Sequence, residues 1–213
     1  MLELVEEHEA KGTLHRGEGP YAPPPATMSE LAFPSKFVCL PDGRLVVSDS
    51  AHHSLKVYNH DDLAMVVGTG ERGWVDGASD VAQFSEPNGV ALLPMHVAQE
   101  VGFDLVVADT VNHVIRGVDS TTWTTTTIAG TGHQWMQGEP DEGDAIGTAL
   151  SSPWDVVWFD DSIIVAMAGV HRLDRLDVRT APGHQVNTLG IEVGDHSQCV
   201  DPAPTLVNSG AGI

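Results

Sequence analysis

The side chains in this sequence that could bind a metal ion or an anion recur at one place in a repeated pattern. Asp49 and Asp109 each end an apolar run, LVVSD and LVVAD, and His53 and His113 follow four residues after them. His171 stands at the matching place in a third copy. Imidazole and carboxylate groups are common metal ligands and proton carriers, so these side chains could form a ring around one mouth of a symmetric fold.

The same positions also have a structural explanation. A carboxylate at the end of a strand can accept hydrogen bonds from backbone N–H groups, and a histidine can pack between neighbouring repeats. Because the pattern recurs with the repeat, we favour this explanation. His52 and His53 are adjacent and point to opposite faces of an extended segment, so they are poorly placed to chelate together. We assign no metal, no cofactor and no catalytic residue to the chain.

Other motifs that could carry chemistry are incomplete. The acidic loop 138–144 (GEPDEGD) lacks the ligand order and the terminal glutamate of an EF-hand, and we expect a solvated loop. The glycines of 68–73 (GTGERG) are not followed by the Lys-Ser/Thr pair of a phosphate loop. Ser48 and Ser50 are not in a G-x-S-x-G nucleophile elbow.

Aromatic side chains occupy the loops that join consecutive repeats. Trp74, Trp135 and Trp154 lie in or just after these loops, and His133 lies in the long loop 133–149. Aromatic residues on loops at one end of a rigid fold are candidates for a surface that binds a protein or a small ligand. Alternatively, they fill gaps between adjacent repeats. Both interpretations stay open, and the tip of the 133–149 loop is the best functional candidate.

These residues depend on three copies of a four-strand unit. Each unit has four β-prone runs separated by turn residues. The unit openings Pro34, Pro87 and Pro153 are 53 and 66 residues apart, the second-run ends Asp49, Asp109 and Met167 are 60 and 58 apart, and the fourth-run ends Gly68, Gly130 and Gly190 are 62 and 60 apart. Such a unit is typical of propeller blades. We predict an all-β fold, a partial β-propeller of about three four-stranded blades.

The chain divides into three parts in this interpretation. We expect a short helix over 2–11 and a proline- and glycine-rich linker from a preceding domain in residues 1–30, three blades in 31–190 (about 31–84, 85–150 and 151–190), and an irregular tail in 191–213. The loops differ in length, chiefly at 94–102 and 133–149. An incomplete propeller leaves edges open at both ends, which favours self-association.

Composition limits the classes of partner. With 30 acidic and 10 basic residues and a net charge of −20, binding to nucleic acid or to an anionic membrane surface is not expected. No apolar run is long enough to span a membrane, and the N-terminus lacks the pattern of a signal peptide. Cys39 and Cys199 form no C-x-x-C motif, and we expect Cys39 to be a buried strand residue in a cytoplasmic protein.

The repeats resemble NHL repeats. The resemblance rests on the P-x-G-V-A opening of Pro87–Ala91, the LVVADTVNHVIR core of Leu105–Arg116 and the IAGTG exit of Ile128–Gly132. The chain is also similar to the propeller part of bacterial thioredoxin-family proteins, of the thiol–disulfide isomerase or alkyl hydroperoxide reductase kind. In these a thioredoxin-like domain precedes the propeller, and residues 6–21 resemble the connector. The redox cysteines of such a domain are absent here, so its chemistry cannot be assigned to a residue of this chain.

Three functions follow as hypotheses. The first is a non-catalytic propeller module that holds a protein or a small ligand on its loop face. The second is a metal-dependent propeller enzyme, lactonase- or lyase-like, which requires His53, His113 and His171 to converge around a central channel. The third is a truncated fragment with no independent function. We favour the first and expect no enzymatic activity, because no catalytic motif is present.

Overall fold

The computed structural model describes residues 7–13, 29–137 and 142–178, and the backbone of 185–189. The chain divides into two units, Met1–Glu30 and Leu31–Ile213. In the first unit, the described part of the helix expected over 2–11 is a helical turn at residues 7–10; its apolar residues Leu2, Leu4 and Val5 lie outside the described residues. No helix in the described residues is long and apolar enough to cross a membrane.

The described residues of the second unit form three antiparallel sheets, which we call blades 1 to 3. Blade 1 has the order β1-β2-β3-β4, with β1 (Pro34–Cys39), β2 (Leu45–Asp49), β3 (Ser54–Asn59) and β4 (Asp62–Val67). Blade 2 has the order β5-β6-β7-β8, with β5 (Pro87–Leu92), β6 (Leu105–Asp109), β7 (Val114–Asp119) and β8 (Thr124–Ala129). Blade 3 has the order β10-β11-β12-β13-β9, with β9 (Gly143–Asp144), β10 (Pro153–Phe159), β11 (Ser162–Met167), β12 (Arg172–Asp177) and β13 (Gln185–Leu189).

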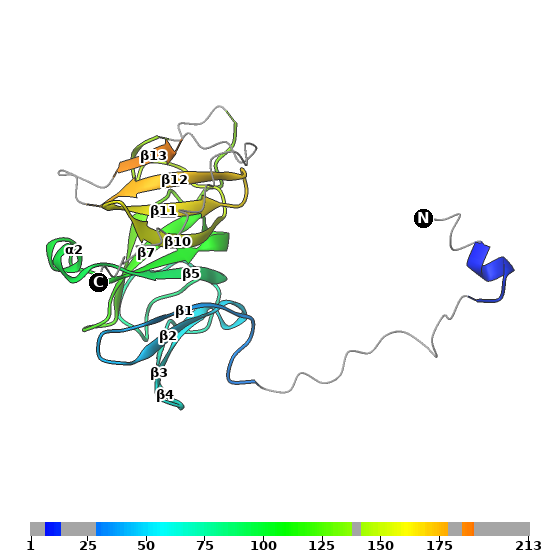
Figure 1. The fold of residues 1–213 in the computed structure, drawn as a ribbon, viewed down its shortest axis with the longest axis horizontal. Helices are drawn as coiled ribbons and strands as arrows, with labels where there is room; N and C mark the ends of the chain where they lie inside the picture. Colours follow the sequence, from blue (N-terminus) through cyan, green and yellow to red (C-terminus); the bar gives the residue numbers. More distant parts are fainter. Residues whose placement is uncertain (1–6, 14–28, 138–141, 179–184, 190–213) are drawn as a thin grey trace, which may run out of the picture. The chain divides into compact units, whose positions relative to one another are not determined.

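The three blades share one register, which confirms the predicted partial β-propeller. Pro34 pairs with Asp49, Pro87 with Asp109, and Pro153 with Met167, so the first residue of each blade lies opposite the end of its second strand. The inner strands β1, β5 and β10 are neighbours, and the blades spread outward from them, blade 1 downward and blade 3 upward in Figure 1. The blades therefore form an arc around their inner strands.

The core consists of two apolar layers, one at each joint between blades. Strand β6 has alternating side chains in both layers, Leu105 and Val107 toward blade 1 and Val106 and Ala108 toward blade 3. All five residues of β6 are buried. The continuous apolar run LVVAD is the sequence of a strand covered on both faces, as the repeat pattern predicts.

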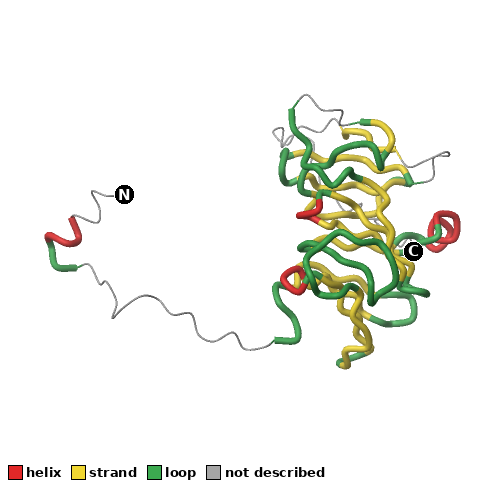
Figure 2. The backbone as a smooth tube through the Cα atoms, turned by 180° about the vertical axis from the view of Figure 1, so that it is seen from behind, coloured by secondary structure: helices red, strands yellow, loops and turns green. Residues whose placement is uncertain are grey.

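Each blade has two ends, and we name them by their connections. The turn end carries the short helical turns η1 (Ser50–His52) and η2 (Thr110–Asn112) together with the loop 68–86 and the described parts, 130–137 and 142–152, of the connection between blades 2 and 3. The hairpin end carries the β1–β2, β5–β6 and β7–β8 connections. Figure 2 shows the helix α2 (Met95–Val101) at the opposite end of the blades from η1 and η2. Segment 94–102, noted in the sequence only as a longer loop, is thus mostly helical.

The prediction that Cys39 is buried is wrong. Cys39 is exposed, and so is Phe37 on the same face of β1. The corresponding residue of blade 2, Val90, is buried because blade 1 covers it. The alternation in β1 identifies a strand, but the face that carries Phe37 and Cys39 has no blade against it in the described structure.

Candidate functional site

The aspartates at the turn end bind backbone N–H groups and neighbouring side chains. Asp49 Oδ1 accepts the N–H of Ala32 at 2.7 Å, and its Oδ2 lies 2.6 Å from His52 Nδ1. Asp109 accepts the N–H of Ser85 at 2.7 Å. Both carboxylates are fully buried, so each fixes the turn that leads into its own blade.

Asp109 has further partners that Asp49 lacks. Its Oδ2 accepts hydrogen bonds from Asn112 Nδ2 and from Arg116 Nη1, each at 2.8 Å. Burial nevertheless raises the pKa of Asp109 to about 6, against the opposing effects of Arg116, Asn112 and the Ser85 N–H. In blade 3 the matching residue is Met167, which is buried and accepts no such bonds.

The histidines link one blade to the next. The ring nitrogen Nδ1 of His53 accepts the N–H of Glu86 at 3.1 Å, and that of His113 accepts the N–H of Ser152 at 3.1 Å. His53, His113 and His171 all have left-handed backbone conformations, with φ of 50°, 54° and 56°. Each therefore ends its turn in the same way, and the rings of His53 and His113 bind the blade that follows.

A shared metal site does not form from these residues. The acceptor nitrogens of His53 and His113 are already used at two separate joints. Among the described residues, no group of three or more His, Cys, Asp or Glu side chains is arranged to hold a metal ion. Residues 138–141 of the acidic loop lie outside the described residues; Gly143 and Asp144 of that loop form β9, which pairs with β13.

The loop aromatic residues have different environments. Trp74 donates from Nε1 to Thr127 Oγ1 at 2.8 Å and packs on Gly132, where a Cβ would lie 2.1 Å from the ring. Trp135 lies under the guanidinium of Arg172, 5.1 Å from the ring centre. Trp74 is nevertheless 43% exposed, and Trp135 is half-buried. Trp154, at the start of β10, and His133 are exposed.

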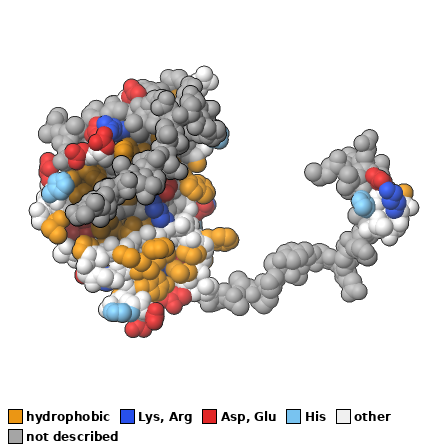
Figure 3. Space-filling model, viewed as in Figure 1, with side chains coloured by type: hydrophobic (Ala, Val, Ile, Leu, Met, Phe, Trp, Pro, Cys, Tyr) orange, Lys and Arg blue, Asp and Glu red, His pale blue; other side chains and the backbone are white. Residues whose placement is uncertain are grey.

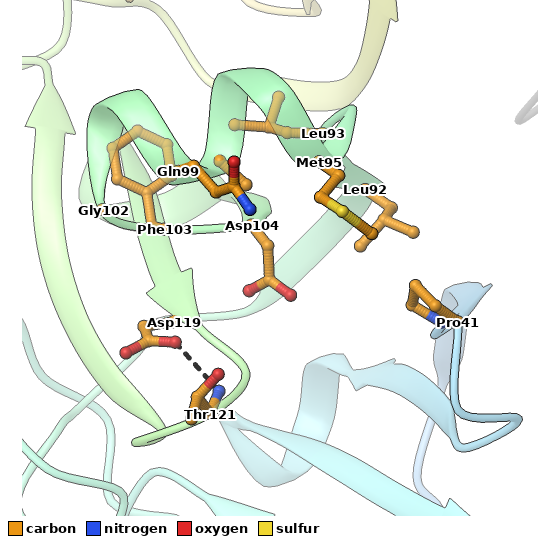
Figure 4. Close-up of a pocket in the computed structure, with 11 residues that line it drawn as sticks. Pro41, Leu92, Leu93, Met95, Gln99, Gly102, Phe103, Asp104, Asp119 and Thr121 are labelled. Carbon is orange, nitrogen blue, oxygen red and sulfur yellow. Dashed lines mark hydrogen bonds between the residues drawn. The ribbon is translucent and has the colours of Figure 1, made fainter.

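The structure contains a cavity at the hairpin end that the repeat pattern did not indicate. It measures about 370 Å³ and lies between α2 of blade 2 and the β1–β2 connection of blade 1. Figure 4 shows Met95 and Leu92 facing Pro41 across it, with the Asp104 carboxylate pointing into the space between them and Thr121. The walls are mostly apolar, with the carboxylates of Asp104 and Asp119 at its base.

Three contacts hold α2 in place beside this cavity. Val97 is fully buried and anchors the helix in the layer between blades 2 and 3. Gly102 ends the helix at φ 84°, and its N–H donates to the carbonyl of Ala98 at 2.9 Å. The Phe103 ring lies on Gly117 of β7, where a Cβ would come within 2.8 Å of it. The helix is therefore a fixed wall of the cavity.

The two carboxylates in the cavity are hydrogen-bonded by hydroxyl and backbone donors. Asp104 accepts the N–H and the hydroxyl of Ser120 at 2.7 and 2.5 Å. Partial burial acts to raise the pKa of Asp119, but hydrogen bonds from Thr122 and Thr121 outweigh it and lower the pKa. No Lys or Arg lines the cavity or pairs with either carboxylate in the described structure. The site therefore combines an apolar wall with uncompensated negative charge.

Sequence reasoning missed this site because it compares repeats and treats an insertion only as a difference in length. A usable signal was present, since 94–102 interrupts a connection that blade 1 makes with the tight turn 40–44. An insertion that the repeat itself does not need is a candidate for function.

Comparisons with known proteins support the repeat assignment. Over 157 residues the chain is 37% identical to NHL repeat-containing protein 2 of Gallus gallus and 35% identical to that of Homo sapiens, and each match covers 68% of this chain and 20% of the relative. It is 32% identical to the protein SUPPRESSOR OF QUENCHING 1, chloroplastic, of Arabidopsis thaliana, covering 70% of this chain and 14% of that protein. The chain thus spans a fifth or less of these relatives.

Solved structures agree on the fold. An auxiliary nutrient binding protein from Bacteroides ovatus superposes with a TM-score of 0.53 at 19% identity, over 72% of this chain and 37% of the other. A protein of the same description from Bacteroides thetaiotaomicron gives 0.53 at 16% identity, over 71% and 36%. No family model matches the chain. Together with the three blades and their common register, these similarities identify the described strands as NHL-repeat blades of a β-propeller.

Proposed function

We propose that this propeller module is a non-catalytic binding module and that its binding site is the cavity beside α2. The observation that carries the proposal is that the one helical insertion of the described blades forms an apolar cavity with two carboxylates at its base. Ordinary blade packing does not require α2, since blade 1 packs with a short connection at the same place.

The chemistry of the cavity favours a protein segment in which an apolar side chain lies next to a basic one. Leu92, Met95 and Phe103 offer apolar surface, and Asp104 and Asp119 offer acceptors for a Lys or Arg. The alternative of a metal-dependent enzyme has no observation in its favour, because His53 and His113 serve separate joints. The association with a thioredoxin-like domain stays a prediction about a longer protein.

The test is fluorescence anisotropy with labelled peptides at physiological ionic strength. One peptide carries a central Leu-Lys-Leu in a Gly-Ser background, and a second carries Ser-Lys-Ser with the same charge. We expect the first to bind more tightly. Met95→Lys removes the apolar wall and adds a repelling charge, whereas Met136→Lys makes the same change at an equally exposed position (70% for both) at the turn end.

Met95→Lys should weaken binding about tenfold or more, and Met136→Lys should change it little. If both variants weaken binding equally, the peptide responds only to the overall charge of the chain. If the two peptides bind alike, the apolar wall has no part in recognition. Either result would overturn the proposed site.

A further inference from the structure

The two joints between blades are built from the same pair of hydrogen bonds. At the first joint His53 Nδ1 accepts the N–H of Glu86, and Ser50 Oγ donates to the carbonyl of Pro87 at 2.7 Å. At the second joint His113 Nδ1 accepts the N–H of Ser152, and Thr110 Oγ1 donates to the carbonyl of Pro153 at 2.7 Å. A histidine on one blade thus binds the opening turn of the next.

The residues that donate to these histidines also share a backbone conformation. Glu86 and Ser152 are left-handed, with φ of 54° and 50°, and each directly precedes the proline that opens its blade. Non-glycine residues adopt this conformation uncommonly, so its recurrence marks a specific geometry. The joint therefore has an acceptor half, the histidine, and a donor half, the left-handed residue before the proline.

Each outer end of the arc carries one unused half. His171, after the second strand of blade 3, has the same left-handed backbone as His53 and His113 and is exposed. Phe33, directly before Pro34 of blade 1, has φ of 55° and is also exposed. Neither the ring of His171 nor the N–H of Phe33 has a hydrogen-bond partner among the described residues.

The inner strands of the two outer sheet faces expose apolar side chains. On blade 1, Phe37 is 63% exposed, whereas Val90 at the matching position of blade 2 is fully covered. On blade 3, Phe159 is 66% exposed, whereas the matching Leu93 is 4% exposed. Figure 3 shows exposed apolar side chains gathered over the strands of blade 1. Along the inner strands, both outer faces therefore expose apolar positions that the joints bury; farther out they carry Lys56 on blade 1 and Arg175 on blade 3.

We propose that blade 3 of one copy of this chain binds blade 1 of a second copy, with His171 Nδ1 accepting the N–H of Phe33. A second copy supplies what each end lacks, because the acceptor half and the donor half are on the same chain. The new joint continues the geometry of the two existing ones. Ala168 replaces the hydroxyl of Ser50 and Thr110, so this joint has one of the two hydrogen bonds and depends more on His171 and the apolar faces.

The two surfaces are different, so the contact is head-to-tail, and an arc of blades favours closure into a ring over an open filament. Light scattering coupled to size exclusion should show a mass that is a multiple of 22.6 kDa at high concentration. His171→Ala should raise the dissociation constant about tenfold or more. His96→Ala, an exposed histidine on α2, is the matched control and should leave the mass unchanged.

A mixing experiment distinguishes head-to-tail contact from any other self-association. Phe37→Glu breaks the blade 1 surface and Phe159→Glu breaks the blade 3 surface, so each variant alone should be monomeric. An equal mixture retains one intact pair of surfaces and should form a heterodimer. A symmetric contact between like surfaces would give no such rescue, and that outcome overturns the proposal.

Cys39 provides a footprint of the covered face. It lies on the same face of β1 as Phe37 and is exposed in the single chain. In a Cys199→Ser background, alkylation of Cys39 should be slow in the assembled wild-type chain and fast in the Phe159→Glu variant. A monomeric mass at every concentration, with fast alkylation of Cys39 throughout, would also overturn the proposal.

Discussion

Replacing Arg116 with Met should destabilise the chain more than any other single loss of charge at the first joint. The guanidinium is fully buried and makes four hydrogen bonds: to Asp109 Oδ2 at 2.8 Å, Asp76 Oδ1 at 2.6 Å, the Val75 carbonyl at 2.7 Å and the Gln83 carbonyl at 2.9 Å. It also lies 5.0 Å from the centre of the Phe84 ring. One side chain thus ties the loop 68–86 to blade 2.

The expected loss in the free energy of unfolding of Arg116→Met comes mainly from Asp109, which stays buried without its partner. Removing one partner of a buried ion pair costs about 3–5 kcal/mol, because the other charge stays buried without compensation. Asp76 is half-exposed, so its share is at most about 1 kcal/mol. Asp109 can limit the loss by taking up a proton, since its pKa is already about 6. We expect a loss of about 3 kcal/mol in the free energy of unfolding at pH 7, and a smaller loss at pH 5.

Urea unfolding followed by tryptophan fluorescence measures this loss. Lys56→Met is the matched control, because Lys56 occupies the same position in blade 1 and is only partly buried; it should cost less than about 1 kcal/mol. Adding Asp109→Asn to Arg116→Met should recover part of the stability. Arg116→Lys keeps the charge and serves if Arg116→Met does not fold. Equal losses for Arg116→Met and Lys56→Met would refute this account.

Three further changes test the joints. Burial raises the pKa of Asp109 from 3.8 to about 6, so its contribution to the free energy of unfolding should fall by about 2 kcal/mol as the pH rises from about 4 to about 6; in urea titrations Asp109→Asn should remove that dependence, and an unchanged pH profile would contradict it. Gly89→Ala places a Cβ 2.6 Å from Asp155 Cα and should lower the melting temperature markedly, whereas Gly147→Ala, with 3.5 Å to its nearest atom, should not. Thr110→Val should cost about 1–3 kcal/mol, because the Pro153 carbonyl loses its donor; the exposed Thr126→Val should be near neutral, and equal effects would argue against the joint.

The fold was predictable because the strand pattern assigned to one repeat could be checked against the same pattern in the other two. The spacing of Pro34, Pro87 and Pro153 and the apolar run of β6 required no knowledge of long-range contacts. The exposure of Cys39 was not predictable in this way, since a strand shows which residues share a face but not whether another blade covers that face. Whether the face that carries Cys39 is covered depends on whether another blade packs against blade 1.

The candidate site was less accessible to the sequence. Segment 95–101 has no side-chain cap at Pro94 and a single fully buried residue, Val97, so neither capping nor periodicity indicated a helix. The recurrence of the histidines in the sequence was a better guide. At successive joints, Nδ1 of His53 and Nδ1 of His113 each accept a backbone N–H from the next blade. The left-handed backbone of the donors, Glu86 and Ser152, could be found only from the coordinates. Neither Glu nor Ser is a residue type that indicates a positive φ.

The joints also select one form of the imidazole ring. Because Nδ1 of His53 and of His113 accepts a backbone N–H, the proton of each neutral ring must be on Nε2. Burial lowers the pKa of His113, which favours the neutral ring that the joint needs. A proton on Nδ1 would turn the His113 acceptor into a donor facing the Ser152 N–H. Each joint is therefore specified by one tautomer of one histidine as well as by its apolar layer.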